Sequence, residues 1–176
     1  MKTYIGIDLG GTNVRCSIVQ PDGTVVETAK GPSHAHEGAD AIISNIVGLI
    51  KQLHNWQDAS GVGVAVPGPV ARDGNGMAMC TNVPCLAKFP LRDTLQNELH
   101  LPCVLGNDAD AAGLAEALVG AGKGLRTVVY ITLSTGIGGA IIYNGQLLPG
   151  SHGYSMEVAS MSVDGSRAHV NLPANG

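Results

Sequence analysis

Short apolar runs alternate with turn signals along the first 30 residues of the chain. Residues 4–9 and 14–19 are apolar runs separated by the two glycines at 10–11. A Pro-Asp-Gly-Thr turn at 21–24 then leads into two valines at 25–26. Short apolar runs bounded by glycine and proline turns are typical of β-strands. The pattern therefore predicts three antiparallel strands at the start of the chain.

Helical periodicity follows. Apolar residues recur at spacings of three and four over residues 38–54, which predicts an amphipathic helix. The later predicted elements are a strand over 62–66, a hairpin over 72–79, a short helix over 91–100, a strand over 102–105 and a helix over 108–119. Strands that alternate with helices indicate an α/β fold.

The second half of the chain begins with the same order of elements as the first. That order is an apolar strand over 128–133, a turn of small residues over 134–139, a strand over 140–143, an Asn-Gly hairpin signal and a strand over 146–148. It forms a weak internal repeat, in which only the first copy is followed by further periodic segments. We therefore expect a first lobe over 1–124 and the beginning of a second, truncated lobe over 125–176.

Composition excludes several classes of protein. The 176 residues are 44% apolar, which is too hydrophobic for an intrinsically disordered chain. No apolar run approaches the roughly 18 residues that a membrane-spanning helix needs. The net charge is −4 and the basic residues are scattered, so the chain has no electrostatic footprint for nucleic acid. We expect a soluble, cytoplasmic protein with neither nucleic acid nor a membrane as its partner.

The four cysteines give no sign of a metal or redox site. Cys16, Cys80, Cys85 and Cys103 lack the C-x-x-C spacing of zinc ribbons and dithiol centres. A chain with a large apolar core also has little need of an extracellular disulfide framework. We expect reduced thiols, most of them buried.

Two glycine-containing turns are candidate phosphate-binding loops. The first closes the initial strand at residues 8–13, where backbone N–H groups can approach phosphate oxygens and Thr12 adds a hydroxyl. The second, at 134–139, occupies the matching place in the repeat. Asp8 can orient a hydrated Mg²⁺, which favours one or two carboxylates together with phosphates. A Gly-Gly turn is also common as an ordinary turn, and neither loop is a Walker A or a Rossmann fingerprint.

Gly106-Asn107-Asp108 lies where a predicted strand ends and a predicted helix begins. Asp108 has two candidate roles there: the N-cap of the helix, or a general base that accepts the proton of an attacking hydroxyl in phosphoryl transfer. Asn107 beside it can hold a substrate hydroxyl. Asn82 and Glu157 are further hydroxyl-binding candidates, although each alone is more typical of a solvated surface.

Five motifs in order resemble those of one family. They are Asp8-Leu9-Gly10-Gly11-Thr12-Asn13, Pro67-Gly68-Pro69-Val70, Thr81-Asn82-Val83-Pro84, Gly106-Asn107-Asp108-Ala109-Asp110-Ala111-Ala112 and Ser134-Thr135-Gly136-Ile137-Gly138-Gly139. Together they are similar to the ROK family of repressors, open reading frames and kinases, and especially to its bacterial glucokinase-like members. The resemblance covers the chain to about residue 160.

The resemblance implies an actin-like ATPase (ribonuclease H-like) fold, with a mixed five-stranded sheet and helices in the first lobe. It implies ATP-dependent phosphorylation of the 6-hydroxyl of a hexose, as in glycolysis, with ATP and Mg²⁺ as cofactors and a homodimer in the full-length protein. Asp108 would be the catalytic base, and Asp8 would be associated with Mg²⁺. The sugar would contact Gly68, Asn82, Asn107 and Glu157, and the ATP phosphates would contact Gly10, Gly11, Thr12, Asn13, Thr135, Gly136 and Gly138.

Two departures from the family pattern leave alternatives open. Family members usually follow the sugar-binding Glu with Ile-Gly-His and a cysteine-rich zinc loop, but here Ser160 stands in place of that His and no cysteine follows. We therefore expect no structural zinc, and the hexose stays open among glucose, N-acetylmannosamine, allose and fructose. The family's remaining second lobe is also absent, so we expect residues 1–176 alone to be inactive. A non-catalytic sugar-binding fragment and a ROK-type transcriptional regulator lacking its DNA-binding domain are the alternative interpretations.

Overall fold

The chain forms two compact units, each with a sheet of its own. The computed structural model describes residues 2–134, 136–149, 156 and 158. Contacts between residues divide the chain into Met1–Asp108 and Ala109–Gly176. The lobe boundary expected after residue 124 stays a prediction.

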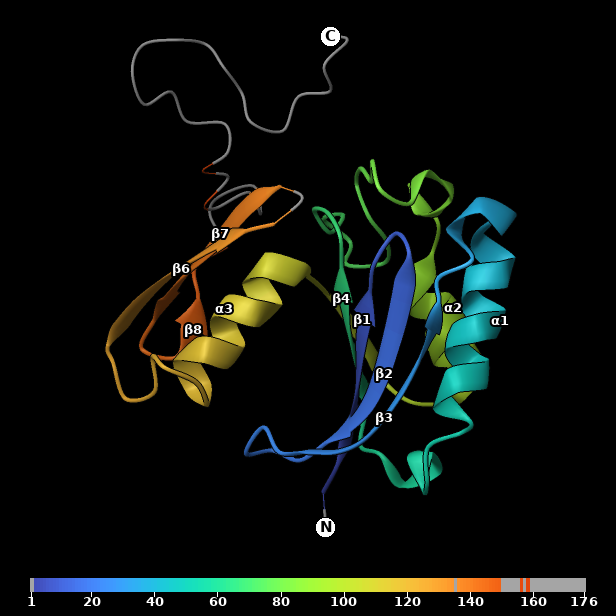
Figure 1. Cartoon of the computed structure of the whole chain (residues 1–176), viewed down its shortest axis with the longest axis horizontal. Coiled ribbons are helices and arrows are strands. Elements are labelled where there is room, and N and C mark those ends of the chain that lie inside the picture. The colour runs from blue at the N-terminus through green and yellow to red at the C-terminus, as the bar shows by residue number, and fades with distance from the viewer. Residues whose placement is uncertain (1, 135, 150–155, 157, 159–176) are drawn as a thin grey trace, which may run out of the picture. The chain divides into compact units, whose positions relative to one another are not determined.

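A mixed five-stranded sheet forms the framework of the first unit (Figure 1). Its strands are β1 (Tyr4–Leu9), β2 (Asn13–Val19), β3 (Val25–Pro32), β4 (Val62–Val66) and β5 (Cys103–Asn107). They lie in the order β3-β2-β1-β4-β5. Pairing is antiparallel from β3 to β1 and parallel from β1 through β4 to β5. The expected mixed five-stranded sheet is thus confirmed.

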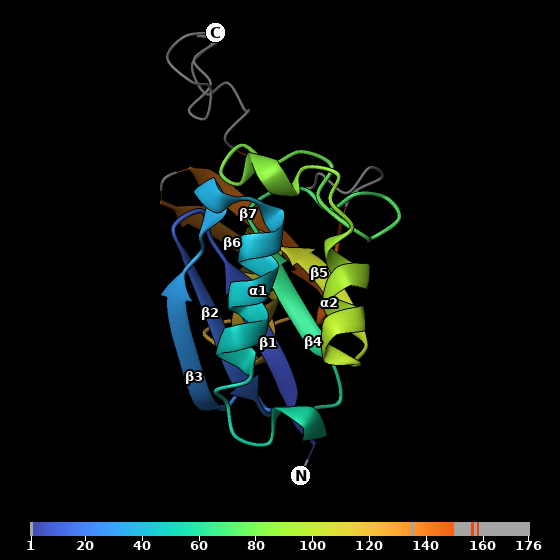
Figure 2. The ribbon, with the colours of Figure 1, turned by 90° about the vertical axis from the view of Figure 1, so that its right-hand side faces the viewer.

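Two helices, α1 (Ala39–Ile50) and α2 (Leu91–Leu99), cover one face of this sheet (Figure 2). Both bury a stripe of aliphatic side chains at helical spacing: Ile42, Ile43, Ile46, Val47, Leu49 and Ile50 from α1, and Leu91, Leu95 and Leu99 from α2. Short 3₁₀ turns are η1 (Ala35–Glu37), η2 (Trp56–Asp58) and η3 (Pro84–Leu86). Within the described part of the chain, no helix is both long and apolar enough to cross a membrane.

Alternation along the central strand explains where the core lies. In β1, Ile5, Ile7 and Leu9 are at most 2% exposed, whereas Tyr4 and Asp8 are exposed. Successive side chains of a strand point to opposite faces of the sheet, so the apolar set packs toward the helices. Each fully buried aliphatic side chain contributes about 1.5–3 kcal/mol. The predicted strand pattern is therefore also the pattern of the core.

The second unit combines a helix with a three-stranded antiparallel sheet. Its elements are α3 (Asp108–Leu118), which begins at the last residue of the first unit, and the strands β6 (Thr127–Leu133), β7 (Ile137–Tyr143) and β8 (Gln146–Leu147). The β7–β8 turn places Asn144 and Gly145 at φ of 50° and 73°, as a type I′ hairpin requires. The meander β6-β7-β8 repeats the antiparallel order of β1-β2-β3, as the internal repeat predicts.

Two strands are longer than the sequence pattern predicts. β3 continues from the two valines to Pro32, because it pairs with β2 as far as Pro32, with one register shift near the valines. β7 begins at Ile137 rather than at residue 140, so Gly138 and Gly139 lie in a strand and pair with β6 instead of forming part of the turn. The residues of the expected second loop are therefore divided between a tight turn and a strand.

One predicted hairpin is only partly formed. The segment 72–79 has no strand of its own, and an isolated antiparallel bridge joins Met77 within it to Val70 just before it. Its glycines and polar residues instead form turns, such as that in which the Gly74 N–H donates to the carbonyl oxygen of Ala71 at 2.8 Å. Turn signals located this segment correctly, but too few apolar residues flank them to extend the pairing.

Replacing Gly113 by alanine should destabilise the second unit. A Cβ at Gly113 would lie 2.7 Å from the Cβ of Ala140 and 3.0 Å from that of Tyr130, so α3 would have to move away from β6 and β7. We expect a loss of about 1–3 kcal/mol in the free energy of unfolding, measured by thermal and chemical denaturation.

Gly48→Ala is the matched control, because Gly48 is also inside a helix but has nothing within 4 Å of its Cβ position. This substitution should stabilise the chain by about 0.5–1 kcal/mol. Equal effects of the two substitutions would contradict the close packing of α3 on its sheet.

Candidate functional site

The carboxyl ends of three parallel strands meet at one edge of the first sheet. Asp8 of β1 lies beside Ala65 of β4, and Ala65 lies beside Gly106 of β5. Each of the three strands ends one residue beyond this line. Ligands of open α/β sheets bind at such carboxyl ends. Candidate residues that follow the three strands therefore share one edge, although they come from separate parts of the sequence.

The loop between β1 and β2 touches the segment that carries Asn82. The N–H of Gly10 donates to the carbonyl oxygen of Asn13 at 2.9 Å, which closes the loop. A Cβ at Gly11 would lie 3.0 Å from the carbonyl oxygen of Asn82, so any side chain there would push the two segments apart. Asp8, Thr12 and Asn82 are exposed. The candidate phosphate loop and a candidate sugar residue are thus neighbours.

Ser33, which is not among the predicted site residues, holds this loop by hydrogen bonds to its backbone. Its Oγ donates a hydrogen bond of 2.6 Å to the carbonyl oxygen of Gly11, and its N–H donates one of 2.7 Å to that of Thr12. Ser33 is only 1% exposed. Ser33 directly follows β3, which extends beyond the two valines that predict it. The sequence pattern alone therefore does not place Ser33 against the loop.

Gly68 connects the ends of β4 and β5. The side-chain Nδ2 of Asn107 donates to the carbonyl oxygen of Gly68 at 3.3 Å. A Cβ at Gly68 would lie 2.7 Å from the carbonyl oxygen of Met79, and the residue has a φ of 155°, so glycine is required there. The structure thus brings together two of the predicted sugar-binding residues, Gly68 and Asn107.

Asp108 also lies at this edge, and its carboxylate is exposed. It is the first residue of α3 and comes directly after β5. Burial raises the pKa of the Cys80 thiol, and the negative charge of Asp108 acts in the same direction. Cys80 also directs its Sγ at the carbonyl oxygen of Pro67, 3.6 Å away. Asp108 is thus close enough to Cys80 to influence its pKa, and Cys80 in turn contacts Pro67, the residue before Gly68.

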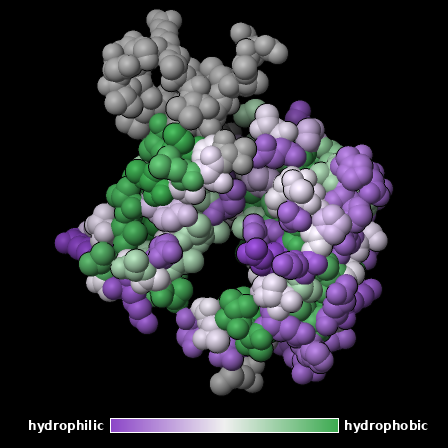
Figure 3. All heavy atoms as spheres, viewed as in Figure 1, coloured by the Kyte–Doolittle hydropathy of each residue, from purple (hydrophilic) through white to green (hydrophobic). Residues whose placement is uncertain are grey.

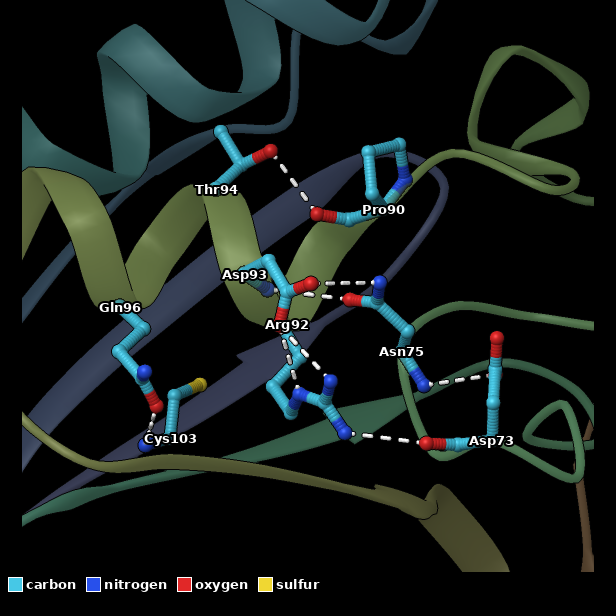
Figure 4. Close-up of polar contacts among 8 residues, drawn as sticks. All are labelled: Asp73, Asn75, Pro90, Arg92, Asp93, Thr94, Gln96 and Cys103. Carbon is cyan, nitrogen blue, oxygen red and sulfur yellow. Dashed lines mark hydrogen bonds and ion pairs between the residues drawn. The ribbon is translucent and has the colours of Figure 1, made fainter.

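A polar network ties the segment before Asn82 to the start of α2 (Figure 4). The Nδ2 of Asn75 donates to Asp93 Oδ2 at 2.8 Å, and the N–H of Asp93 donates back to Asn75 Oδ1 at 3.1 Å. The guanidinium of Arg92 donates to Asp93 Oδ1 and, at 3.0 Å, to the carbonyl oxygen of Asp73. Reciprocal bonds of this kind fix a long connection that has little regular structure of its own.

The remaining predicted site residues belong to the second unit. Glu157, Thr135 and Ser160 lie outside the described residues. Gly136 accepts a 2.8 Å hydrogen bond from the N–H of Ser134 and so forms the tight turn between β6 and β7. Gly138 pairs with Thr132, and a Cβ there would lie 3.1 Å from that of Ala109. A side chain at Gly138 would therefore need Ala109 to shift slightly, whether or not the strand binds a phosphate.

Among the described residues, no group of three or more His, Cys, Asp or Glu side chains could hold a metal ion. All four cysteines are free, and three of them, Cys16, Cys80 and Cys103, are buried as expected. Burial raises the pKa of Cys16 to about 12 and that of Cys103 to about 11, so these two thiols stay protonated at neutral pH.

The five motifs lie within a stretch of sequence that matches the model of one protein family. The model of the ROK family matches residues 4–171. The chain belongs to the ROK family. This membership confirms the resemblance that the five motifs carried.

Known relatives of this ROK protein include sugar kinases. A glucokinase of Halalkalibacterium halodurans is 34% identical over 167 residues, which are 92% of this chain and 50% of the relative. An N-acetylmannosamine kinase of Shigella flexneri is 32% identical over 163 residues, which are 92% of this chain and 55% of the relative. The chain thus spans about half the length of the curated relatives it matches.

A solved structure supports the fold assignment. A ROK family glucokinase from Streptomyces griseus, in complex with glucose and AMPPNP, is 31% identical and superimposes with a TM-score of 0.81. The match covers 92% of this chain and 51% of that chain. The expected actin-like ATPase fold is confirmed.

Asn75→Asp should weaken the attachment of the segment before Asn82. The new carboxylate would replace an amide that donates to Asp93 Oδ2 at 2.8 Å, so a hydrogen bond becomes a repulsion between like charges. We expect a loss of about 1–2 kcal/mol in unfolding free energy at neutral pH. The loss should shrink at a pH low enough to protonate one carboxylate, since the protonated group can donate again.

The control is Asn97→Asp, the same chemical change at an exposed position of α2. It should change the unfolding free energy by less than about 0.5 kcal/mol. If denaturation gave the same result for both variants, the reciprocal bond between Asn75 and Asp93 would have no energetic importance.

Proposed function

We propose that the full-length protein containing this chain is an ATP-dependent kinase that phosphorylates the 6-hydroxyl of a hexose. Sugar kinases among its ROK relatives support the reaction class. The observation that carries the proposal is the single edge of the first sheet at which Asn107, Asp108 and Gly68 meet and where Gly11 touches Asn82. Phosphoryl transfer needs this combination of an acceptor-binding region, a base and a phosphate loop.

Asp108 is the proposed general base. Its carboxylate accepts the proton of the sugar hydroxyl as that oxygen attacks the γ-phosphorus of ATP, and ADP leaves. Its exposure and its place after β5 support the role, because the base must reach a bound substrate directly. Its position as the first residue of α3 also suits an acidic residue, since the helix N-terminus stabilises negative charge.

Side chains around Asp108 are proposed to hold the sugar. Asn107 and Asn82 each offer a donor and an acceptor for hydroxyl groups. Asn107 is oriented by its bond to the carbonyl oxygen of Gly68, which supports a fixed position for its amide. Glu157 is proposed as a further sugar contact from the sequence alone.

The loop at residues 10–13 is proposed to bind ATP phosphates through its backbone N–H groups and the Thr12 hydroxyl. The close approach of Gly11 to the Asn82 segment, where a Cβ would be tight, supports this role, because a backbone without a Cβ can come near an anion. Asp8, an exposed carboxylate two residues before the loop, fits a hydrated Mg²⁺, which would neutralise phosphate charge when bound. Thr135, Gly136 and Gly138 are proposed as the second phosphate contact.

Asp108→Asn in the full-length protein should abolish turnover while sugar binding is retained. The amide keeps the shape of the side chain but cannot accept the proton, so we expect kcat to fall by roughly 10²–10⁴. ADP release is measured with glucose, N-acetylmannosamine, allose and fructose, and sugar binding is measured by calorimetry. Asp40→Asn, an exposed carboxylate on α1, is the control and should leave kcat unchanged. Near-normal turnover by Asp108→Asn would refute the assignment of the base.

Residues 1–176 produced alone should neither phosphorylate a sugar nor stay monomeric. The relatives with kinase activity are about twice as long. β6 also exposes Val129, Ile131 and Leu133 at 56%, 54% and 77%, and Figure 3 shows apolar surface over this hairpin. An apolar face on an edge strand favours self-association. The tests are ADP release and size-exclusion chromatography, and a monodisperse monomer that phosphorylates glucose would contradict both expectations.

A further inference from the structure

We propose that Ser33 is a positioning residue of the phosphate loop, which holds the main chain of residues 11–13 so that its N–H groups face the phosphates. The inference rests on the proposed function, because it assumes that this loop binds ATP. It is carried by the burial of Ser33, by its hydrogen bonds and by the direction of the peptide groups that it holds.

Ser33 uses both its hydroxyl and its backbone on the loop. Its Oγ donates to the carbonyl oxygen of Gly11 at 2.6 Å, and its N–H donates to that of Thr12 at 2.7 Å. The same Oγ accepts a longer bond of 3.4 Å from the N–H of Ala35. With 1% of its surface exposed, Ser33 has no access to water that could replace these partners. One residue therefore occupies two consecutive carbonyls of the loop.

These two bonds determine the direction of two N–H groups. In a trans peptide the C=O and the N–H point in opposite directions, and the described chain has no cis peptide. The Gly11 carbonyl shares its peptide with the Thr12 N–H, and the Thr12 carbonyl shares its peptide with the Asn13 N–H. Because both carbonyls point at buried Ser33, both N–H groups point away from it. Successive N–H groups turned the same way favour an anion.

Ser33 is itself held in place by its neighbours. Pro32 is the last residue of β3 and pairs with Asn13 of β2. Its carbonyl oxygen accepts a hydrogen bond from the Nδ2 of Asn45 on α1. The strand end that carries Ser33 is therefore attached to both a neighbouring strand and a helix. A strand end held on two sides gives one hydroxyl a fixed place from which to hold the loop.

Ser33→Ala tests the proposal, because it deletes the hydroxyl and keeps the backbone bond to Thr12. AMPPNP binding is measured by calorimetry in the full-length protein, and the KM for ATP, the KM for sugar and kcat are measured with glucose and N-acetylmannosamine. We expect roughly tenfold weaker AMPPNP binding and a roughly tenfold higher KM for ATP, with the KM for sugar unchanged. Ser33→Thr retains the hydroxyl and should recover most of the affinity.

A stability control separates positioning from general loosening. Val62 is 3% exposed and pairs with Ile5, at the opposite end of β1 from the loop. Val62→Ala should lower the melting temperature without raising the KM for ATP. The proposal is overturned if Ser33→Ala binds AMPPNP normally, raises both KM values equally or fails to unfold cooperatively. If the wild-type protein neither binds AMPPNP nor phosphorylates a hexose, the proposed function fails first, and this inference falls with it.

Discussion

Parallel pairing of β1, β4 and β5 is the constraint on which the rest of the first unit depends. It places Asp8, Ala65 and Gly106 side by side, and so brings three distant segments to one edge. A slip of one residue in any of these strands would turn its apolar side chains to the opposite face. The burial of Ile5 and Ile7 against α1 and α2 therefore also maintains the alignment of the candidate site.

At that edge the segments meet through their backbones, and this explains why the site motifs contain glycine. Gly11 faces the carbonyl oxygen of Asn82 at a distance that leaves a Cβ little room, and Gly68 faces that of Met79 at a distance that excludes one. Contacts between main chains leave polar side chains such as Asn107 at the surface of the edge. The glycines let the loops approach each other, whereas neighbouring polar side chains are the ones proposed to bind substrate.

Local pattern predicted the strands and helices well, because the alternation in β1 and the helical stripe of α1 are each contained in one segment. Local pattern does not predict contacts between residues far apart in the sequence, or strand pairing at residues without an apolar side chain. Ser33 and Gly11 are 22 residues apart, and Asn75 and Asp93 are 18 apart, so no local pattern connects them. The predicted start of β7 is too late, because Gly138 pairs through its backbone and contributes nothing to an apolar pattern. The glycine and asparagine motifs indicate candidate residues, but only the folded sheet shows which residues lie next to them.

The two meanders show how far local sequence carries a fold. β1-β2-β3 and β6-β7-β8 have the same antiparallel order, and each first strand ends in a leucine before its turn. Yet Leu9 is 1% exposed and Leu133 is 77% exposed. In the first unit α1 and α2 cover the strand face, whereas within the described residues of the second unit α3 packs on the side that buries Ala140 and Ile142. Turn chemistry and pairing therefore suffice to specify the order of a meander. An apolar face of the meander is buried only where a further layer of structure covers it. The same apolar alternation that forms a core in one unit leaves apolar side chains exposed in the other.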